Sequence, residues 1–282
     1  MWVFNSLFGK IFNIIFFPFR SMNPWVGMIL ISFLTAILML FIFRFTSNQE
    51  GIRQVKNKIK AHLLELRLYK DSLSLSFKAQ GNILRYNLRY ISYSAKPLLV
   101  MIIPLILILI QLNLWFGYEA LAPGQEAILK VKLEEGQNPL DANLALEPSS
   151  GFEIQTPALR IEEEMEISWR LQAREKGVLD LTLIVNGQRI IKKVAVDQRP
   201  LSKISPLKVR RSFINELINP GESPFPGDLP IKTIEVNYPA RDMNLFGWNI
   251  PWLLGIPPWL IAYFALSIIL GFVFKGIFKV EI

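Results

Sequence analysis

Three apolar segments, each long enough to cross a bilayer as a helix, constrain this chain more than any other feature. They run from Trp25 to Phe45, from Pro97 to Tyr118 and from about Ile250 to Phe274. A hydrocarbon core about 30 Å thick requires roughly 20 helical residues. The sequence therefore predicts an integral membrane protein with three transmembrane helices, the last in residues 248–282.

The net charge of +8 on this 282-residue chain is unevenly distributed. Between Asn48 and Lys96 there are ten Lys or Arg residues against three Asp or Glu residues, whereas Tyr118 to Gly247 holds sixteen against nineteen. Basic loops stay on the cytoplasmic side of a membrane. We therefore expect a bacterial inner (plasma) membrane protein with the basic segment and the C-terminus in the cytoplasm and the N-terminus outside.

Residues 1–22 precede the first predicted span, residues 23–46, and are amphipathic. A narrow polar stripe recurs at helical spacing and consists of Asn5, Ser6, Gly9, Lys10 and Asn13. Such a pattern is typical of a helix that lies in the membrane interface. The alternative is a fourth, short transmembrane helix, but Lys10 at its centre argues against it.

Residues 47–96 predict a basic hairpin of two antiparallel helices. Two apolar stripes at helical spacing would pack together: Ile52, Val55, Ile59, Leu63 and Leu66, and Leu73, Phe77, Leu84, Leu88 and Ile91. The basic residues expected outside are Lys56, Lys58, Lys60, Arg67, Lys78, Arg85 and Arg89. This exterior suits anionic lipid headgroups, a ribosome or an acidic partner, without specificity for a nucleic-acid sequence. The alternative is that the charges only fix the topology.

The predicted spans contain few polar residues, so each is a candidate for a site. The first contains Ser32, Thr35 and, near its cytoplasmic end, Arg44; the second, residues 97–118, contains Gln111 and Asn113 toward its outer end. Arg44 suits either an anchor at the headgroups or a positive charge at the mouth of a polar groove between helices.

Three stretches carry a resemblance to a known family. They are LFGKIFNIIFFPF followed by NPWVGMILISFLTAILML, then QVKNKIKAHLLELRLYKD, then AKPLLVMIIPLILILIQLNLWFGY. Through the order of these stretches, the chain resembles the YidC/Oxa/Alb membrane insertase superfamily, including its three-span forms. The resemblance covers roughly residues 2–118 and the last span. Bacterial members commonly carry an arginine midway along the first core span, and ISFLTAILML has none.

The resemblance implies a groove, open to the cytoplasm and to lipid, into which a hydrophobic segment of a client membrane protein slides. No covalent chemistry is involved. The residues of this chain that would contact clients are Ser32, Thr35, Arg44, Gln111 and Asn113.

Residues 119–199 change to short alternating runs separated by turn residues, which predict an antiparallel sandwich of immunoglobulin-like type. Asn186-Gly187 predicts a tight hairpin turn, and Trp169 is expected in the core. Residues 200–247 are rich in proline and glycine and predict a flap or linker with a short helix at Leu207 to Ile218. In the last span, Ser267 and Gly271 predict close approach of another helix, either in a dimer or against the first two spans.

The chain shows no phosphate-binding loop, nucleophile and base arrangement, or paired catalytic carboxylates. It has no cysteine, and His62 is its only histidine. We therefore expect no enzyme activity, cofactor or metal. Two functions remain: an insertase or chaperone for client membrane proteins, and a scaffold whose external β domain binds an envelope partner.

Overall fold

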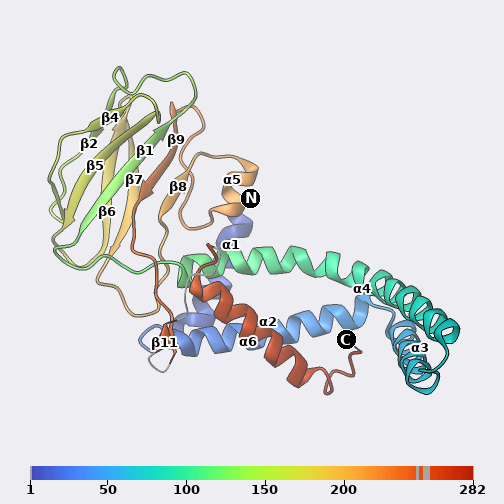
Figure 1. The fold of residues 1–282 in the computed structure, drawn as a ribbon. Coiled ribbons are helices and arrows are strands. Elements are labelled where there is room, and N and C mark those ends of the chain that lie inside the picture. Colours follow the sequence, from blue (N-terminus) through green and yellow to red (C-terminus); the bar gives the residue numbers. More distant parts are fainter. Residues whose placement is uncertain (1, 246–247, 250–254, 282) are drawn as a thin grey trace. The chain divides into compact units, whose positions relative to one another are not determined.

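The computed structural model describes residues 2–245, 248–249 and 255–281. The chain divides into two compact units, which we call the β unit and the helical unit. The β unit consists of Met1–Gly27 and Ile108–Ile261, and the helical unit of Met28–Leu107 and Ala262–Ile282. The helices and strands are shown in Figure 1.

The helices are α1 (Trp2–Phe16), a 3-10 turn η1 (Phe17–Phe19), α2 (Pro24–Thr46), α3 (Gln49–Leu68), α4 (Leu73–Phe116), α5 (Phe213–Ile218) and α6 (Pro258–Phe274). Among the described residues, α2 and α4 are long and apolar enough to cross a membrane, while α6 is apolar but shorter, with 17 residues. The sequence placed the start of the last span near Ile250, which lies outside the described residues. Its described helix begins at Pro258.

α4 differs from the sequence prediction because it is one helix of 44 residues that continues through Pro97 and Pro104. The sequence divides this stretch by composition, into a basic hairpin (47–96) and an apolar span (97–118). The second helix of the basic hairpin and the second apolar span are therefore a single element. At 1.5 Å per residue α4 is about 66 Å long, well beyond the thickness of a hydrocarbon core.

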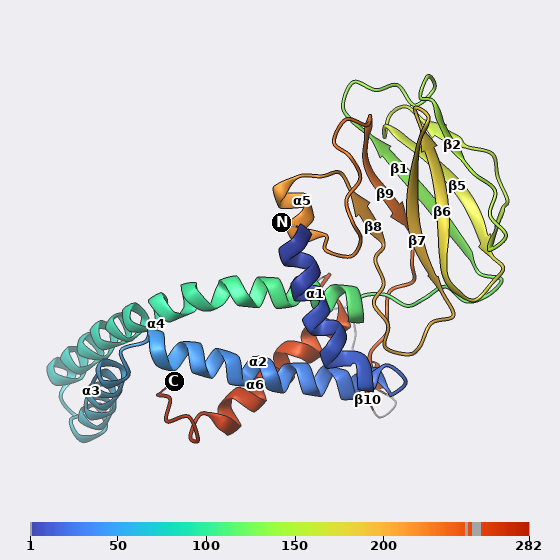
Figure 2. The ribbon, with the colours of Figure 1, turned by 180° about the vertical axis from the view of Figure 1, so that it is seen from behind.

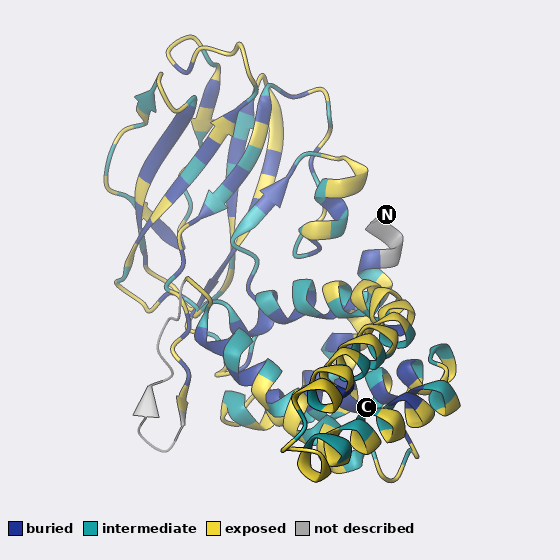
Figure 3. Ribbon diagram, turned by 45° about the vertical axis from the view of Figure 1, so that its right-hand side comes forward, coloured by how far each residue is buried: buried dark blue, intermediate teal, exposed yellow. Residues whose placement is uncertain are grey.

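The hairpin, formed by α3 and the first half of α4 within the helical unit, packs through a different face of α4 from the one predicted. The stripe expected to be buried is exposed, with Leu73 at 74%, Phe77 at 68% and Leu88 at 59%. Tyr86 instead contacts α3, since its ring stacks on His62 at a centroid distance of 5.5 Å, and Ala79 is the buried residue of this half of α4. Figure 3 shows how much of this helix pair is exposed. An apolar stripe identifies a face, and here that face does not meet α3.

The β unit contains two antiparallel sheets. The strands are β1 (Glu126–Leu133), β2 (Leu144–Leu146), β3 (Phe152–Ile154), β4 (Leu159–Ile161), β5 (Glu166–Ala173), β6 (Gly177–Val185), β7 (Gln188–Val196), β8 (Leu207–Val209) and β9 (Ile231–Val236), with a separate pair β10 (Asn244–Leu245) and β11 (Trp248–Asn249). One sheet has the order β3-β5-β1-β9-β8, with β4 also paired to β5, and the other has the order β2-β6-β7.

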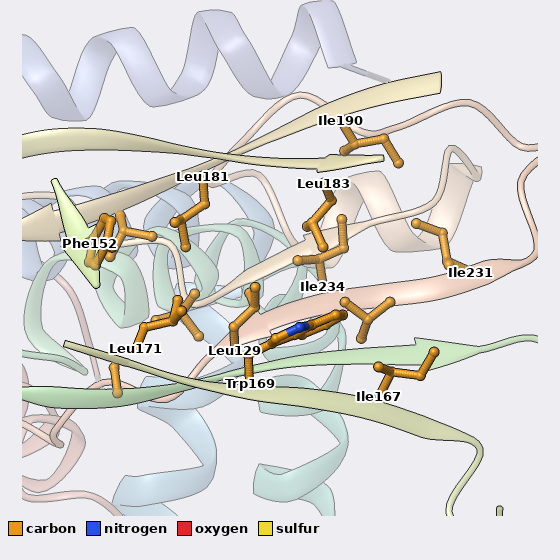
Figure 4. Packing of buried hydrophobic residues seen from close by; sticks show 14 of the residues in the cluster. Leu129, Phe152, Ile167, Trp169, Leu171, Leu181, Leu183, Ile190, Ile231 and Ile234 are labelled. Carbon is orange, nitrogen blue, oxygen red and sulfur yellow. The ribbon is translucent and has the colours of Figure 1, made fainter. Parts of the chain in front are cut away.

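One hydrophobic core lies between these two sheets. Leu181, Leu183 and Ile190 from one sheet face Leu129 and Trp169 from the other (Figure 4). The core forms because residues alternate in and out along each strand, as in β1. Trp169 is 5% exposed, so its predicted place in the core is confirmed.

The predicted hairpin turn at Asn186-Gly187 is also confirmed. Val185 pairs with Gln188, which leaves a two-residue loop. The φ angles are 48° at Asn186 and 82° at Gly187, as a type I′ turn requires.

The prediction that residues 200–247 form a flap or linker is wrong. β8 and β9 from this segment belong to the larger sheet, and Phe225, Ile234 and Tyr238 are buried in the core. The β domain therefore extends beyond residue 199. The predicted helix at 207–218 is also shorter, because 207–209 form β8 and only Phe213–Ile218 are helical. Short strands between proline and glycine residues leave a weak local pattern, and their pairing with β1 depends on distant residues.

Candidate functional site

The helical unit contains an apolar groove of about 430 Å³ between α2, α4 and α6. Its lining residues are Thr35, Ala36, Met39, Leu40 and Phe43 from α2, Leu98, Met101, Ile102 and Leu105 from α4, and Tyr263, Phe264, Ser267, Ile268, Gly271 and Phe272 from α6. Two of the three helices are the candidate membrane spans. A volume of this size is typical of a site that buries a small ligand or a few side chains of a bound polypeptide segment.

Three hydroxyl groups form the polar part of this groove. The Tyr263 hydroxyl lies close enough to the Thr35 and Ser267 side chains to interact with both. However, Thr35 Oγ1, Tyr263 Oη and Ser267 Oγ all lack a hydrogen-bond partner of regular geometry in the described part of the chain. Buried hydroxyl groups are normally paired. The three hydroxyl groups are therefore buried beside one another in the wall of the groove.

Gly271 lines the same groove, and this bears on the predicted close approach of another helix. A Cβ atom added at Gly271 would meet no described atom within 4 Å. Gly271 therefore borders open space, and none of the described helices packs on it.

The other polar residues predicted in the first span are placed differently. Ser32 is fully buried, and its Oγ has no hydrogen-bond partner among the described residues. Arg44 is exposed in the last turn of α2 and is not part of the groove lining. Of the three α2 candidates, Thr35 alone lines the groove.

Gln111 and Asn113 belong to the β unit. Gln111 is 1% exposed and its Oε1 is without a partner in the described structure. A Cβ atom on Gly9 of α1 would lie 3.8 Å from the Gln111 amide and 3.6 Å from Lys203 Nζ, so both side chains lie beside Gly9. Asn113 instead lines a second cavity of about 410 Å³, together with residues of α5 and α6.

The predicted basic surface of the hairpin is largely exposed. Lys58, Lys60, Arg67, Lys78, Arg85 and Arg89 are all in the exposed class. Lys56 is half-buried, and its Nζ lies 3.2 Å from a carboxylate oxygen of Glu281 in the C-terminal tail. The tail also donates the Glu281 N–H to Gln49 Oε1 at 2.6 Å. Lys56 thus helps to hold the C-terminal tail against the first two turns of α3.

An apolar stripe on α4 runs without interruption from the hairpin to the groove. Its members recur every three or four residues and are all exposed: Leu84, Leu88, Ile91, Ala95, Leu98, Ile102 and Ile106. Leu98 and Ile102 also line the groove. The stripe and the groove therefore form one continuous surface of the helical unit.

The sequence analysis missed a buried ion pair in the β unit. Lys192 is fully buried, and its Nζ donates to the Glu222 carboxylate and, at 2.7 Å, to the Ser205 carbonyl oxygen. Burial lowers the pKa of Lys192, and the negative charge of Glu222 partly opposes this effect. The sequence did contain a signal for this buried lysine, because the alternation of residues along β7 places Lys192 on the same inward face as Ile190 and Val194.

Arg241 is a second buried cation that was missed. It is 7% exposed and donates from Nη1 to the Pro200 carbonyl at 2.9 Å and from Nη2 to the Tyr118 carbonyl at 3.0 Å. Burial lowers the pKa of its guanidinium group, while Glu119 opposes the shift. This side chain ties together three separate segments of the β unit.

Comparison with known proteins adds no assignment: no family model, curated protein or solved structure matches the chain.

Proposed function

We propose that this protein is embedded in a bacterial inner membrane, with α2, α4 and α6 as its three spans. The length and composition of α2 and α4 support this. The 17 residues of α6 fall at the lower limit for a spanning helix. The basic hairpin supports a cytoplasmic location for α3, with the β domain outside. The two facing antiparallel sheets with a buried Trp169 support an immunoglobulin-like fold for that domain.

The proposed function is that of a membrane protein insertase or chaperone that eases transmembrane segments of clients into the bilayer. The observation that carries this proposal is the apolar groove between α2, α4 and α6, with the hydroxyl groups of Thr35, Tyr263 and Ser267 in its lining. A client segment needs apolar contacts that replace lipid and a few polar groups that hydrogen-bond its backbone or flank. The groove surface supplies the apolar contacts, and the three hydroxyl groups lie buried in its wall.

The physical work of such a site is to lower a desolvation barrier. An unpaired polar group in hydrocarbon costs roughly 2–7 kcal/mol. The hydroxyl groups in the groove wall would reduce this cost if they turned toward a polar residue of the client, with no covalent step and no cofactor. The exposed basic residues of the hairpin would attract a ribosome or anionic headgroups by charge alone.

Crosslinking in cells tests the proposal. A photoreactive amino acid at Thr35 lines the groove, and one at the neighbouring Leu34, which is 38% exposed but outside the lining, is the matched control. We expect Thr35 to capture many newly made membrane proteins and Leu34 to capture few. Positions Arg44 and Gln111 define how far the client contact extends.

The alternative is a scaffold whose β domain binds an envelope partner. A hollow of about 280 Å³ beside Trp169, bordered by residues 156–159 and 168–170, favours it. In this case Thr35 would capture neighbouring helices alone, and a photoreactive residue at Leu159 would capture one fixed partner. That pair of results would refute the insertase proposal.

A further inference from the structure

The short helix α5 has an inverted distribution of side chains. Its carboxylate residue Glu216 is 8% exposed, whereas Phe213, Ile214 and Ile218 are 64%, 63% and 53% exposed. The helix is well formed, because the Ser212 hydroxyl caps its first turn by accepting from the Asn215 N–H at 3.3 Å. A helix with its charge inside and its large apolar side chains outside does not suit an aqueous surface.

α1 lies against α5 (Figure 2) and also exposes apolar side chains, although Phe12 and Phe16 are buried. Asn5 is 3% exposed, and its amide donates to the carbonyl oxygen of Glu216. The opposite face of α1 exposes Leu7 at 62%, Ile14 at 73% and, just past its end, Phe17 at 67%, together with Lys10. A hydrogen bond thus joins the two helices, and both expose apolar side chains.

The depth of α5 follows from the cavity that it shares with α4. Ile218 and Asn219, at the end of α5, line the same cavity as Leu109 and Ile110 of α4. Leu109 lies seven residues before the end of α4 at Phe116, which is about 10 Å along the helix axis. The C-terminal end of α5 therefore lies beside the last two turns of a candidate span, at a cavity that Glu235 of β9 also lines.

We propose that α5 is a membrane anchor of the β domain, immersed together with α1 in the leaflet on the β-domain side. The anchor surface consists of Leu7, Ile14, Phe17, Phe213, Ile214 and Ile218, and lipid acyl chains cover it. Arg211, exposed just before the Ser212 cap, is placed to reach the phosphate groups of the lipids. This anchor is independent of the insertase proposal, because it requires membrane embedding and no client.

Site-directed fluorescence tests the anchor in the full chain reconstituted in lipid nanodiscs. The chain has no cysteine, so a single cysteine introduced as Ile214→Cys carries one environment-sensitive dye. The aqueous control is Leu140→Cys, 54% exposed in a loop of the β domain, and the membrane control is Ile103→Cys, 66% exposed on α4. Phe213→Cys provides a second reporter if the first variant does not fold.

We expect nitroxide-labelled lipids to quench most of the fluorescence at Ile214 and Ile103 and little at Leu140, and dissolved iodide to quench only Leu140. Quenching of Ile214 by iodide would overturn the proposal. Protection of Ile214 from both quenchers would show that protein, such as a second copy, covers α5, and would also overturn it. If Ile103 escapes the lipid quencher, the chain is not embedded and the anchor falls with the membrane assignment. Loss of client crosslinking at Thr35 would leave the anchor intact.

Discussion

The buried pair of Lys192 and Glu222 provides the most stringent test of the β domain. The exposed fractions of the two side chains are 0% and 8%, so Glu222→Gln removes a charge while it keeps the shape. Lys192 then remains buried with its carbonyl contacts to Ser205 at 2.7 Å and Lys193 at 3.3 Å. Glu222 also accepts the Lys193 N–H at 3.1 Å, and a glutamine oxygen can take over one of these roles but not both.

The expected magnitude follows from these contacts. Removal of one partner from a buried ion pair costs about 3–5 kcal/mol. Because two carbonyl acceptors remain for Lys192, we expect the lower end, about 3 kcal/mol, or roughly a 10²-fold shift in the unfolding equilibrium. The double variant Lys192→Met with Glu222→Gln removes both charges and should be more stable than the single Glu222→Gln variant.

Native-state hydrogen exchange of the full-length protein in detergent measures this effect. Peptides from β6 and β7 report the free energy of opening around Lys192, and the exposed pair of Arg189 and Glu147, with Nη2 and Oε1 2.9 Å apart, provides a control through Glu147→Gln. We expect a change below about 1 kcal/mol for the control. Equal protection in the Glu222→Gln and wild-type proteins would refute the reasoning, as would a double variant that is less stable than Glu222→Gln.

The same pair predicts a pH dependence. Burial lowers the pKa of Lys192 below its ordinary 10.5, and Glu222 opposes this. The folded protein therefore releases this proton at a lower pH than the unfolded chain. Between these two pKa values the unfolded state binds more protons, so the free energy of unfolding increases with pH up to 10.5. In Glu222→Gln the opposing charge is lost, and the increase should be larger. A stability that is independent of pH in this variant would contradict the argument.

Two further predictions concern packing and chain connection. Trp169→Ala should lower the free energy of unfolding by about 3–5 kcal/mol, because it leaves a cavity in the core. Hydrogen exchange of peptides from β1 and β5 measures this loss. Trp169→Phe should cost less, and equal losses in the two variants would contradict the packing argument. Arg241→Lys should cost about 1–3 kcal/mol, because one ammonium group cannot reproduce the two-pronged contact with Tyr118 and Pro200. Faster exchange at the Glu119 and Leu121 amides would reveal this loss, with the exposed Arg211→Lys as a neutral control.

Features that depend on adjacent residues could be predicted from the sequence. The Asn186-Gly187 turn needs two consecutive positive φ angles, and α2 needs an apolar run, so both follow from local chemistry. β8 and β9 could not be recognised in the same way, because their hydrogen bonds go to each other and to β1, about a hundred residues earlier. The proline and glycine residues around them gave the stronger local signal.

The candidate site was predicted in part for the same reason. Thr35 was identified because a polar residue in an apolar run is conspicuous, and it lines the groove. Tyr263 was not, since a tyrosine in an aromatic-rich helix looks like an interfacial residue, and only the arrangement of α2 and α6 within the helical unit brings its hydroxyl toward Thr35. The sequence analysis noted Ser267 for its small size and not for its hydroxyl group, which lies beside that of Tyr263 in the groove wall.

The apolar stripe on α4 helps to separate the two proposed functions. A scaffold whose helices only anchor it would have its exposed apolar surface end where the basic hairpin begins, since beyond that point the helix faces water and headgroups. Here Leu84, Leu88 and Ile91 remain exposed among Arg85 and Arg89. Exposed aliphatic side chains in water are unfavourable by roughly 25 cal/mol per Å². The insertase proposal requires an apolar path for a client segment, and the stripe continues into the groove at Leu98 and Ile102; the scaffold proposal instead requires a permanent partner on Leu84, Leu88 and Ile91.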